Sequence, residues 1–205
     1  MNETRFTAAD LEPSDEEKQA ARRLAVDRIA ATLGALAAGI WVGGMIALGA
    51  CAAPFVFRMT PDPFSGDAMG AAFARFDQIA LGAAVVLLGV EVARTWASGP
   101  GGRGILPRVR RITAFAMAAC AAYIGLALTP RISELHRSGV RRGFGPEGEV
   151  LEQVHKRAEA IGKAEVVLGV ALVALHVFTL RARRPEDDLE DIDPSPGPLP
   201  PGPRG

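Results

Sequence analysis

Four side chains that could do chemistry lie inside long apolar runs of the sequence: Glu91, Met117, Cys120 and His176. A carboxylate and an imidazole together can pass a proton or hold an ion, whereas a thioether and a thiol are soft ligands for Cu(I). If each run is a membrane helix rising about 1.5 Å per residue, all four side chains fall in one layer, roughly 6–12 Å from one membrane edge. They form the candidate intramembrane polar site, since ionisable groups at this depth usually face a bundle interior.

Simpler roles are open for the same side chains. Glu91 can pair with Arg94, which follows three positions later on the same helical face. His176 can be a core histidine bonded to a backbone carbonyl or a hydroxyl. The sharper expectation is that Glu91 and His176 approach each other, because a mutual hydrogen bond offsets the cost of burying either alone. Nearer the opposite membrane face, one further carboxylate, Glu165, has three polar candidates as partners: Arg75, Asp77 and Gln78.

A copper or haem site has less in its favour. Met117 and Cys120 could add soft ligands for Cu(I), but the sequence lacks methionine and histidine pairs at helical spacing. Haem would need histidines at one level, and His136 and His155 fall a full bilayer away from His176. We predict no metal site and no cofactor.

The elements that position these residues are four apolar runs. Residues 29–57 contain no charged residue, and about 20 apolar residues suffice for a helix to cross a bilayer. Three further runs cover 76–97, 112–130 and 161–180. The predicted fold is therefore all-α, a four-helix transmembrane bundle over residues 28–181.

Polar segments flank this membrane domain. In residues 1–27, Ser14 followed by Glu17 predicts a capped helix start. Residues 182–205 are acidic and then rich in proline and glycine, so they cannot bury a core and are predicted to form a disordered tail. A further amphipathic helix is expected from about Glu149, continuing into the fourth span.

The first span has small residues at a regular spacing. They recur every four positions, so they lie along one helical face: Ala35, Gly39, Gly43 and Ala47. Such a face packs closely against another helix, either inside the bundle or in a dimer. Trp41, in the middle of the run, is expected to be a packing residue, and Pro54 is expected to end or kink the helix.

Charge places the chain relative to the membrane. With four spans, 14 of the lysines and arginines fall on the side of the two termini and 9 on the other side. The positive-inside rule then predicts a multi-pass protein of the cell (inner) membrane with both termini cytoplasmic.

Several classes of protein are excluded. The net charge of zero argues against a nucleic-acid partner. The sequence has no phosphate-binding glycine loop, nucleophile elbow, HExxH or paired CxxC, so we predict no catalytic residues and no enzyme. The two cysteines, Cys51 and Cys120, lie in apolar runs and are expected to be buried free thiols.

Four short motifs accompany the predicted spans: two lie in the first span, one opens the second, and one leads into the fourth. They are Trp41-Val42-Gly43-Gly44-Met45, Ala53-Pro54-Phe55-Val56-Phe57-Arg58, Gly70-Ala71-Ala72-Phe73-Ala74-Arg75-Phe76 and Leu151-Glu152-Gln153-Val154-His155. In these motifs the chain resembles the domain-of-unknown-function 4149 family, bacterial relatives of transmembrane protein 205, and more distantly the copper-resistance D-type membrane domains.

The resemblance implies a four-helix integral membrane protein without a defined reaction, and it marks Pro54, Phe57, Arg58 and His155 as family-motif positions. In the family pattern, a serine and an asparagine often follow the histidine that matches His155. This chain has Ala158 and Gly162 at those places, so part of that polar cluster is missing.

Three functional hypotheses remain. The first is a bundle in the lipid bilayer that moves or shelters a small solute or ion, or assists a membrane-protein partner. The second is a copper- or haem-handling domain. The third is a structural module that forms homo-oligomers through the face of Gly39 and Gly43.

Overall fold

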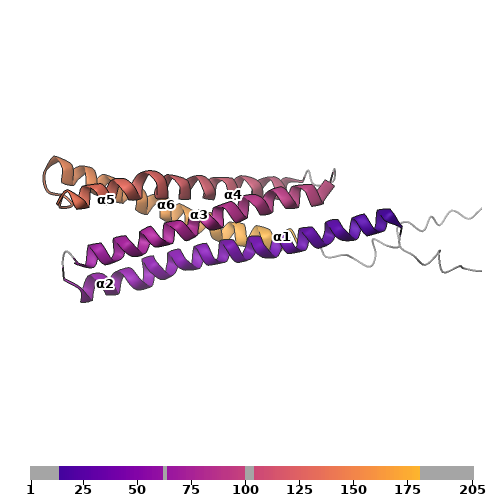
Figure 1. Ribbon diagram of the computed structural model, residues 1–205, viewed down its shortest axis with the longest axis horizontal. Helices are drawn as coiled ribbons and strands as arrows, with labels where there is room; N and C mark the ends of the chain where they lie inside the picture. Colours follow the sequence, from indigo (N-terminus) through magenta and orange to yellow (C-terminus); the bar gives the residue numbers. More distant parts are fainter. Residues whose placement is uncertain (1–13, 62–63, 100–103, 181–205) are drawn as a thin grey trace, which may run out of the picture.

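The computed structural model describes residues 14–61, 64–99 and 104–180. These residues form helices and no strand, arranged as four long rods (Figure 1). The first rod is α1 (Asp15–Ile46), the π-helix η2 (Ala47–Ala52) and α2 (Ala53–Met59), and the second is α3 (Phe64–Ser98). The third is α4 (Ile105–Tyr123), the π-helix η4 (Ile124–Leu128) and α5 (Thr129–Arg137), and the fourth is α6 (Gly145–Phe178).

All four rods are long and apolar enough to cross a membrane, which confirms the predicted all-α bundle of four spans. The first and third rods each pack against both α3 and α6, so α1 and α4 occupy opposite corners of a four-cornered bundle. We call the end where α1 begins and α6 ends the terminal end, and the end with α2 and α5 the loop end (Figure 1). The predicted disordered tail, 182–205, and residues 1–13 lie outside the described residues.

The helices are longer than the apolar runs that revealed them. α3 begins at Phe64, α4 at Ile105 and α6 at Gly145, well before the predicted spans that start at 76, 112 and 161. Hydropathy marks only the part of a helix that contacts lipid, whereas polar residues can continue the same helix beyond it. The predicted amphipathic extension of the fourth span is confirmed. So is the capped start of α1, where Ser14 and Glu17 form a reciprocal capping box.

Two prolines, Pro54 and Pro130, sit just after the two π-helices. Proline lacks an N–H and its ring crowds the carbonyl four residues earlier, so a wider turn before it relieves the clash. Both rods continue past the proline, to Met59 and to Arg137. Pro54 therefore does not end its helix, which was the first of the two outcomes expected for it, and the helix that contains the third span continues beyond Pro130.

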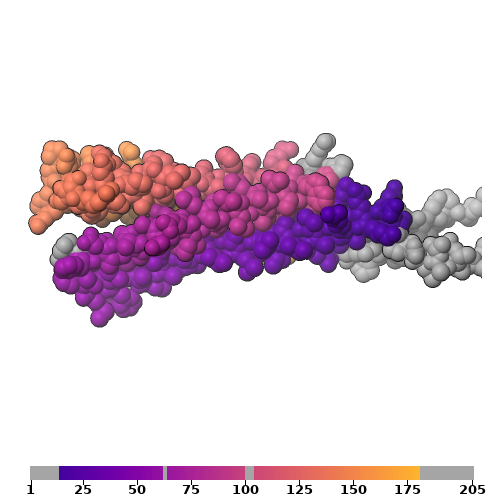
Figure 2. Space-filling model, viewed as in Figure 1, coloured from indigo at the N-terminus to yellow at the C-terminus, as the bar shows by residue number. Residues whose placement is uncertain are grey.

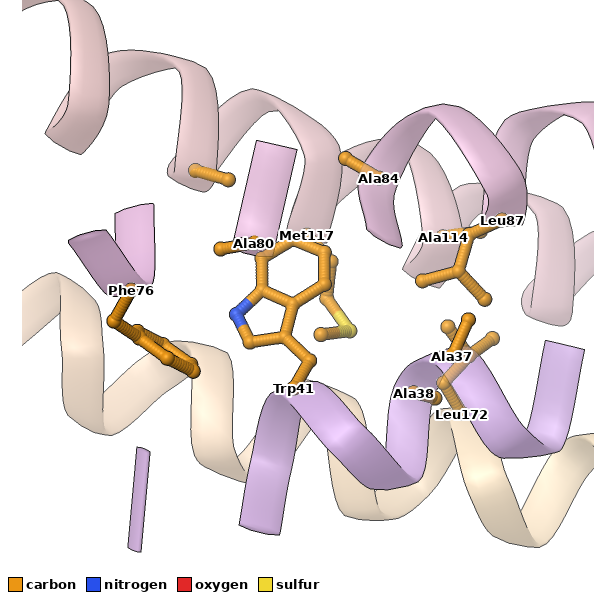
Figure 3. Close-up of a cluster of buried hydrophobic side chains, with 11 residues drawn as sticks. Ala37, Ala38, Trp41, Phe76, Ala80, Ala84, Leu87, Ala114, Met117 and Leu172 are labelled. Carbon is orange, nitrogen blue, oxygen red and sulfur yellow. The ribbon is translucent and has the colours of Figure 1, made fainter. Parts of the chain in front are cut away.

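The centre of the bundle is apolar. Trp41, Leu87, Met117 and Leu172 are fully buried there, and Figure 3 shows the Trp41 ring beside Met117 and Ala80. The predicted packing role of Trp41 is confirmed. Phe76 and small alanines from α1, α3 and α4 complete this core, and the alanines let the rods approach.

The outside of the bundle is apolar as well. The space-filling view shows a long, narrow body whose two ends lie far apart (Figure 2). Along it, large apolar side chains such as Val85 (72%), Leu126 (70%) and Val167 (69%) are widely exposed. An apolar surface of this extent would aggregate in water and suits a lipid bilayer.

Close helix packing occurs at glycines other than the predicted ones. A Cβ at Gly39 or Gly43 would meet nothing within 4 Å, so the expected packing of this face inside the bundle was wrong. A Cβ at Gly34 would instead collide with the His176 ring, and one at Gly169 with Val42. Periodicity shows which small residues share a face, but every face of this span is apolar, so it does not show which face points inward.

Candidate functional site

Six polar residues from all four rods meet near the terminal end: Asp27, Glu91, Arg94, Arg110, His176 and Thr179. We call them the charged cluster. The four charged residues are at most 6% exposed, and His176 is completely buried. Two arginines face two carboxylates, so the cluster has no net charge when the histidine is neutral. Each arginine is hydrogen-bonded, which is the condition under which buried charges are tolerated.

Arg94 of α3 connects three rods. Its Nε donates to Asp27 Oδ1 of α1 at 2.9 Å, and its Nη1 lies 3.1 Å from His176 Nδ1 of α6. Its Nη2 donates to the carbonyl oxygen of Thr179 at 2.8 Å, where α6 ends and its dipole is negative. Arg94 therefore does not form the expected pair with Glu91 on its own helix, because Asp27 across the interface takes that place.

Arg110 of α4 is the second buried arginine. Its Nε donates to Glu91 Oε1 at 2.7 Å, and its Nη1 donates to the Thr179 hydroxyl at 2.7 Å. The sequence placed this arginine in a basic stretch outside the third span. Because α4 already begins at Ile105, Arg110 lies inside the helix and only 3% of it is exposed.

The hydrogen bond from Arg94 fixes the protonation of His176. A guanidinium only donates, so Nδ1 must accept and the neutral ring carries its proton on Nε2. Nε2 lies 3.8 Å from Glu91 Oε1. The two predicted partners therefore come together, but beyond hydrogen-bond distance. Within the described chain, His176 Nε2 and Glu91 Oε2 have no hydrogen-bond partner.

A pocket of about 260 Å³ opens beside the cluster, between the start of α1 and the end of α3. Asp27 lines it, together with Arg23 and Ser98. Asp27 Oδ2 and Arg23 Nε have no hydrogen-bond partner among the described residues. Asp27 thus connects the pocket to Arg94, and through Arg94 to His176.

The family model for a domain of unknown function (DUF4149) matches residues 36–141, more than half of the chain. The protein belongs to the DUF4149 family. No curated protein and no solved structure matches it. The matched region includes Glu91, Arg94 and Arg110, while Asp27 and His176 lie outside it.

In this DUF4149 protein, Met117 and Cys120 do not join the charged cluster. Met117 is fully buried in the apolar core, about two helical turns beyond Arg110, and Cys120 lies further along α4. The predicted layer was wrong for these two because depth was counted from the start of the apolar run, whereas α4 starts earlier. The described residues contain no group of three or more histidine, cysteine, aspartate or glutamate side chains that could hold a metal.

Both cysteines are free thiols. Cys120 is partly buried, but Cys51 is exposed on the apolar outer surface, which corrects the expectation that both are buried. The surface there suits lipid, so an exposed thiol at this point needs no protein partner.

The family-motif positions of the DUF4149 protein lie at the loop end, away from the cluster. Pro54, Phe57 and Arg58 are exposed on the first rod. His155 of α6 meets His136 of α5, with 3.5 Å between their Nε2 atoms and the rings edge to face. These residues share no contact with Glu91 or His176.

Sequence reasoning named Glu91, His176 and Arg94, but it missed the other half of the charged cluster and the partner that Arg94 takes. Asp27, Arg94 and Arg110 stand at the edges of apolar runs, where charged residues usually anchor a helix at the membrane surface. Their pairing depends on contacts between rods. The sequence signal that could have indicated the cluster is the number of charged residues, since several arginines and acidic residues border the apolar runs at the same end of the bundle.

Proposed function

We propose that this DUF4149 protein is a non-catalytic membrane protein that handles a proton at the charged cluster, in the service of small-solute or ion movement. The observation that carries the proposal is the 3.8 Å separation between Nε2 of His176 and Oε1 of Glu91. Both groups are buried; His176 Nε2 has no hydrogen-bond partner among the described residues, whereas Glu91 Oε1 accepts a hydrogen bond from Arg110. Ionisable residues at this depth usually serve ion or proton pathways.

Proton binding is coupled to a change of contacts in this arrangement. Nδ1 of His176 is occupied by the hydrogen bond from Arg94, so the ring takes a second proton only when Arg94 releases it. The resulting imidazolium pairs with Glu91 through Nε2, while Arg94 keeps Asp27 and the end of α6. One proton therefore alters how α6 is held against α3, and this gives a two-state element.

Access to the cluster is supported by the pocket lined by Asp27. Its Oδ2 has no hydrogen-bond partner among the described residues, so it is the oxygen of Asp27 that remains able to take a proton. Protonation of Asp27 weakens its ion pair with Arg94, so the guanidinium loses one of the contacts that fix its position beside His176. The same chain of contacts thus passes a signal from the pocket to the buried ring.

The test is a flux assay with the full-length protein in liposomes that enclose a pH-sensitive dye. After an external pH step, the dye should respond faster than in empty liposomes, and Glu91→Gln should return the rate towards that of empty liposomes. Glu152→Gln is the matched control, since Glu152 pairs with Arg142 near the surface of the loop end. A wild-type rate equal to that of empty liposomes would refute proton handling.

The second candidate is a purely structural module. It is favoured by the balance of charges in the cluster, which ties all four rods together without a ligand. In this case the liposome assay shows no flux, and the same substitutions only lower stability. A homo-oligomer through the open face of Gly39 and Gly43 belongs to this candidate and is tested by the molecular mass in detergent.

We place the protein in the cell (inner) membrane with both termini cytoplasmic, on the basis of the excess of basic residues at the terminal end. Copper handling has no support from the contacts, since Met117 and Cys120 lie apart from His176. Metal analysis of the purified protein tests it directly.

A further inference from the structure

A second buried carboxylate, Glu165 of α6, lies apart from the charged cluster. Only 3% of it is exposed, and its Oε1 has no hydrogen-bond partner among the described residues. We propose that Glu165 is a proton-binding site in the middle of the bundle, reached from the loop end through Asp77. This inference goes beyond the proposed function and does not depend on the charged cluster.

The contacts on either side of Glu165 show where it lies along the length of the bundle. A Cβ at Gly162 would lie 3.1 Å from Met45, and one at Gly169 would collide with Val42 of the same rod. Glu165 stands between these contacts, about three helical turns before His176. Leu172, which lies between the two on α6, belongs to the apolar core together with Met117 (Figure 3). The two polar sites are therefore separate.

The surroundings of Glu165 contain no compensating cation. The titratable groups whose charges act on each other here are Glu165, Asp77 of α3 and Cys120 of α4, all acidic. From α1, Val42 and Met45, which do not titrate, face the turns of α6 on either side of Glu165. No arginine, lysine or histidine of the described chain forms an ion pair with Glu165, whereas Glu91 has Arg110.

An isolated buried carboxylate binds a proton more readily than it stays charged, because burial of an unpaired charge is costly. A metal ion is a poor alternative, since the described part of the chain offers no group of three ligating side chains. A second carboxylate nearby strengthens the preference for a proton, as two like charges in a low-dielectric site cannot both persist. A proton is thus the ligand that fits.

Asp77 provides the connection towards the loop end. Its Oδ2 accepts a hydrogen bond from the Thr129 hydroxyl at 2.6 Å, and it is partly exposed. Thr129 directly follows the π-helix η4, whose Gly125 lies beside Asp77. π-Helical turns are frequent at functional sites because they disturb the regular hydrogen-bond ladder. Asp77 also lies closer to the loop-end start of its helix than Glu165 does.

The test uses dicyclohexylcarbodiimide, an apolar reagent that attacks protonated carboxyl groups inside membranes. The acid proton moves to a carbodiimide nitrogen, the carboxyl oxygen bonds to the central carbon, and the acyl group then migrates to nitrogen as a stable N-acylurea. The full-length protein is treated in liposomes over a range of pH, and the modified peptides are identified by mass spectrometry. Glu165 should be modified, increasingly so at lower pH.

Glu91 is the internal control, since it is equally buried but ion-paired with Arg110. It should react at least ten times more slowly than Glu165 at neutral pH. Asp77→Asn removes the neighbouring acid and should move the pH dependence of Glu165 modification towards lower pH.

Three outcomes would overturn the proposal. The first is that Glu165 stays unmodified at every pH, and the second is that Glu91 and Glu165 react equally. The third is that sodium protects Glu165 at constant pH where potassium does not, because the site would then bind a metal cation. None of these outcomes bears on the flux assay for the charged cluster, so the two proposals fail separately.

Discussion

Arg94 and Asp27 form a buried ion pair between two rods, with 2.9 Å between Arg94 Nε and Asp27 Oδ1, and they stand 67 residues apart in the sequence. The pair joins α1 to α3 at the terminal end. Arg94 also holds His176 and the end of α6, so one guanidinium sets the relative position of three rods.

The first prediction concerns that guanidinium. Arg94→Lys keeps the charge but cannot reach Asp27, His176 and Thr179 together, since the three N–H donors of lysine sit on one nitrogen. We expect a lower melting temperature in detergent and a loss of about 3–5 kcal/mol when the pair is broken outright by Arg94→Met. An unchanged melting temperature in both variants would show that the pair does not hold the rods.

The second prediction separates stability from proton handling. Glu91→Gln leaves the Arg110 charge buried without a counter-charge and should destabilise the protein by roughly 3 kcal/mol. The double substitution Glu91→Gln/Arg110→Gln removes both charges, so it should recover most of that stability while the liposome flux stays lost. Recovery of flux in the double variant would exclude Glu91 as the proton partner of His176.

The third prediction contrasts two glycines of α1. Gly34→Ala inserts a methyl group into the space of the His176 ring and should cost about 1–3 kcal/mol, as overpacked cores do. Gly43→Ala meets nothing within 4 Å and should leave the stability of the monomer unchanged. Thermal unfolding in detergent measures both. If Gly43→Ala destabilises the protein and lowers its oligomeric mass, the open face is occupied by another copy.

The fourth prediction concerns orientation. Reporter fusions after Gly101 and after Gly205 should both report the cytoplasm, and a fusion after Gly143 should report the outside, because basic residues are in excess at the terminal end. A periplasmic signal from the fusion after Gly205 would contradict the predicted cytoplasmic position of the termini.

The sequence predicts the four spans well because contact with lipid demands long apolar runs, and nothing else in the chain competes with that demand. It also predicts the approach of Glu91 to His176. Each is an isolated polar residue, and its depth in the membrane follows from its distance in residues to the end of its apolar run. Arg110 was missed because the edge of an apolar run was taken as the edge of the helix.

The sequence alone does not show which acidic residue pairs with which arginine. Glu91 could have paired with Arg94 on its own helix. In the structure Glu91 pairs with Arg110 of α4, and Arg94 pairs with Asp27 of α1. The choice depends on which helix faces turn inward. In α1 all faces are apolar, so the stripe with Gly39 and Gly43 gave no indication that it points outward.

The π-helix η4 also sets the rotation of everything that follows it. A π-helical turn holds one residue more than an α-helical turn, so it acts as a built-in single-residue insertion. Deleting one residue between 124 and 128 would restore an ordinary α-helix and turn α5 by about 100°. Thr129 would then swing away from Asp77, and His136 away from His155. Chain length in this short stretch is thus under a tighter constraint than the identity of its apolar side chains.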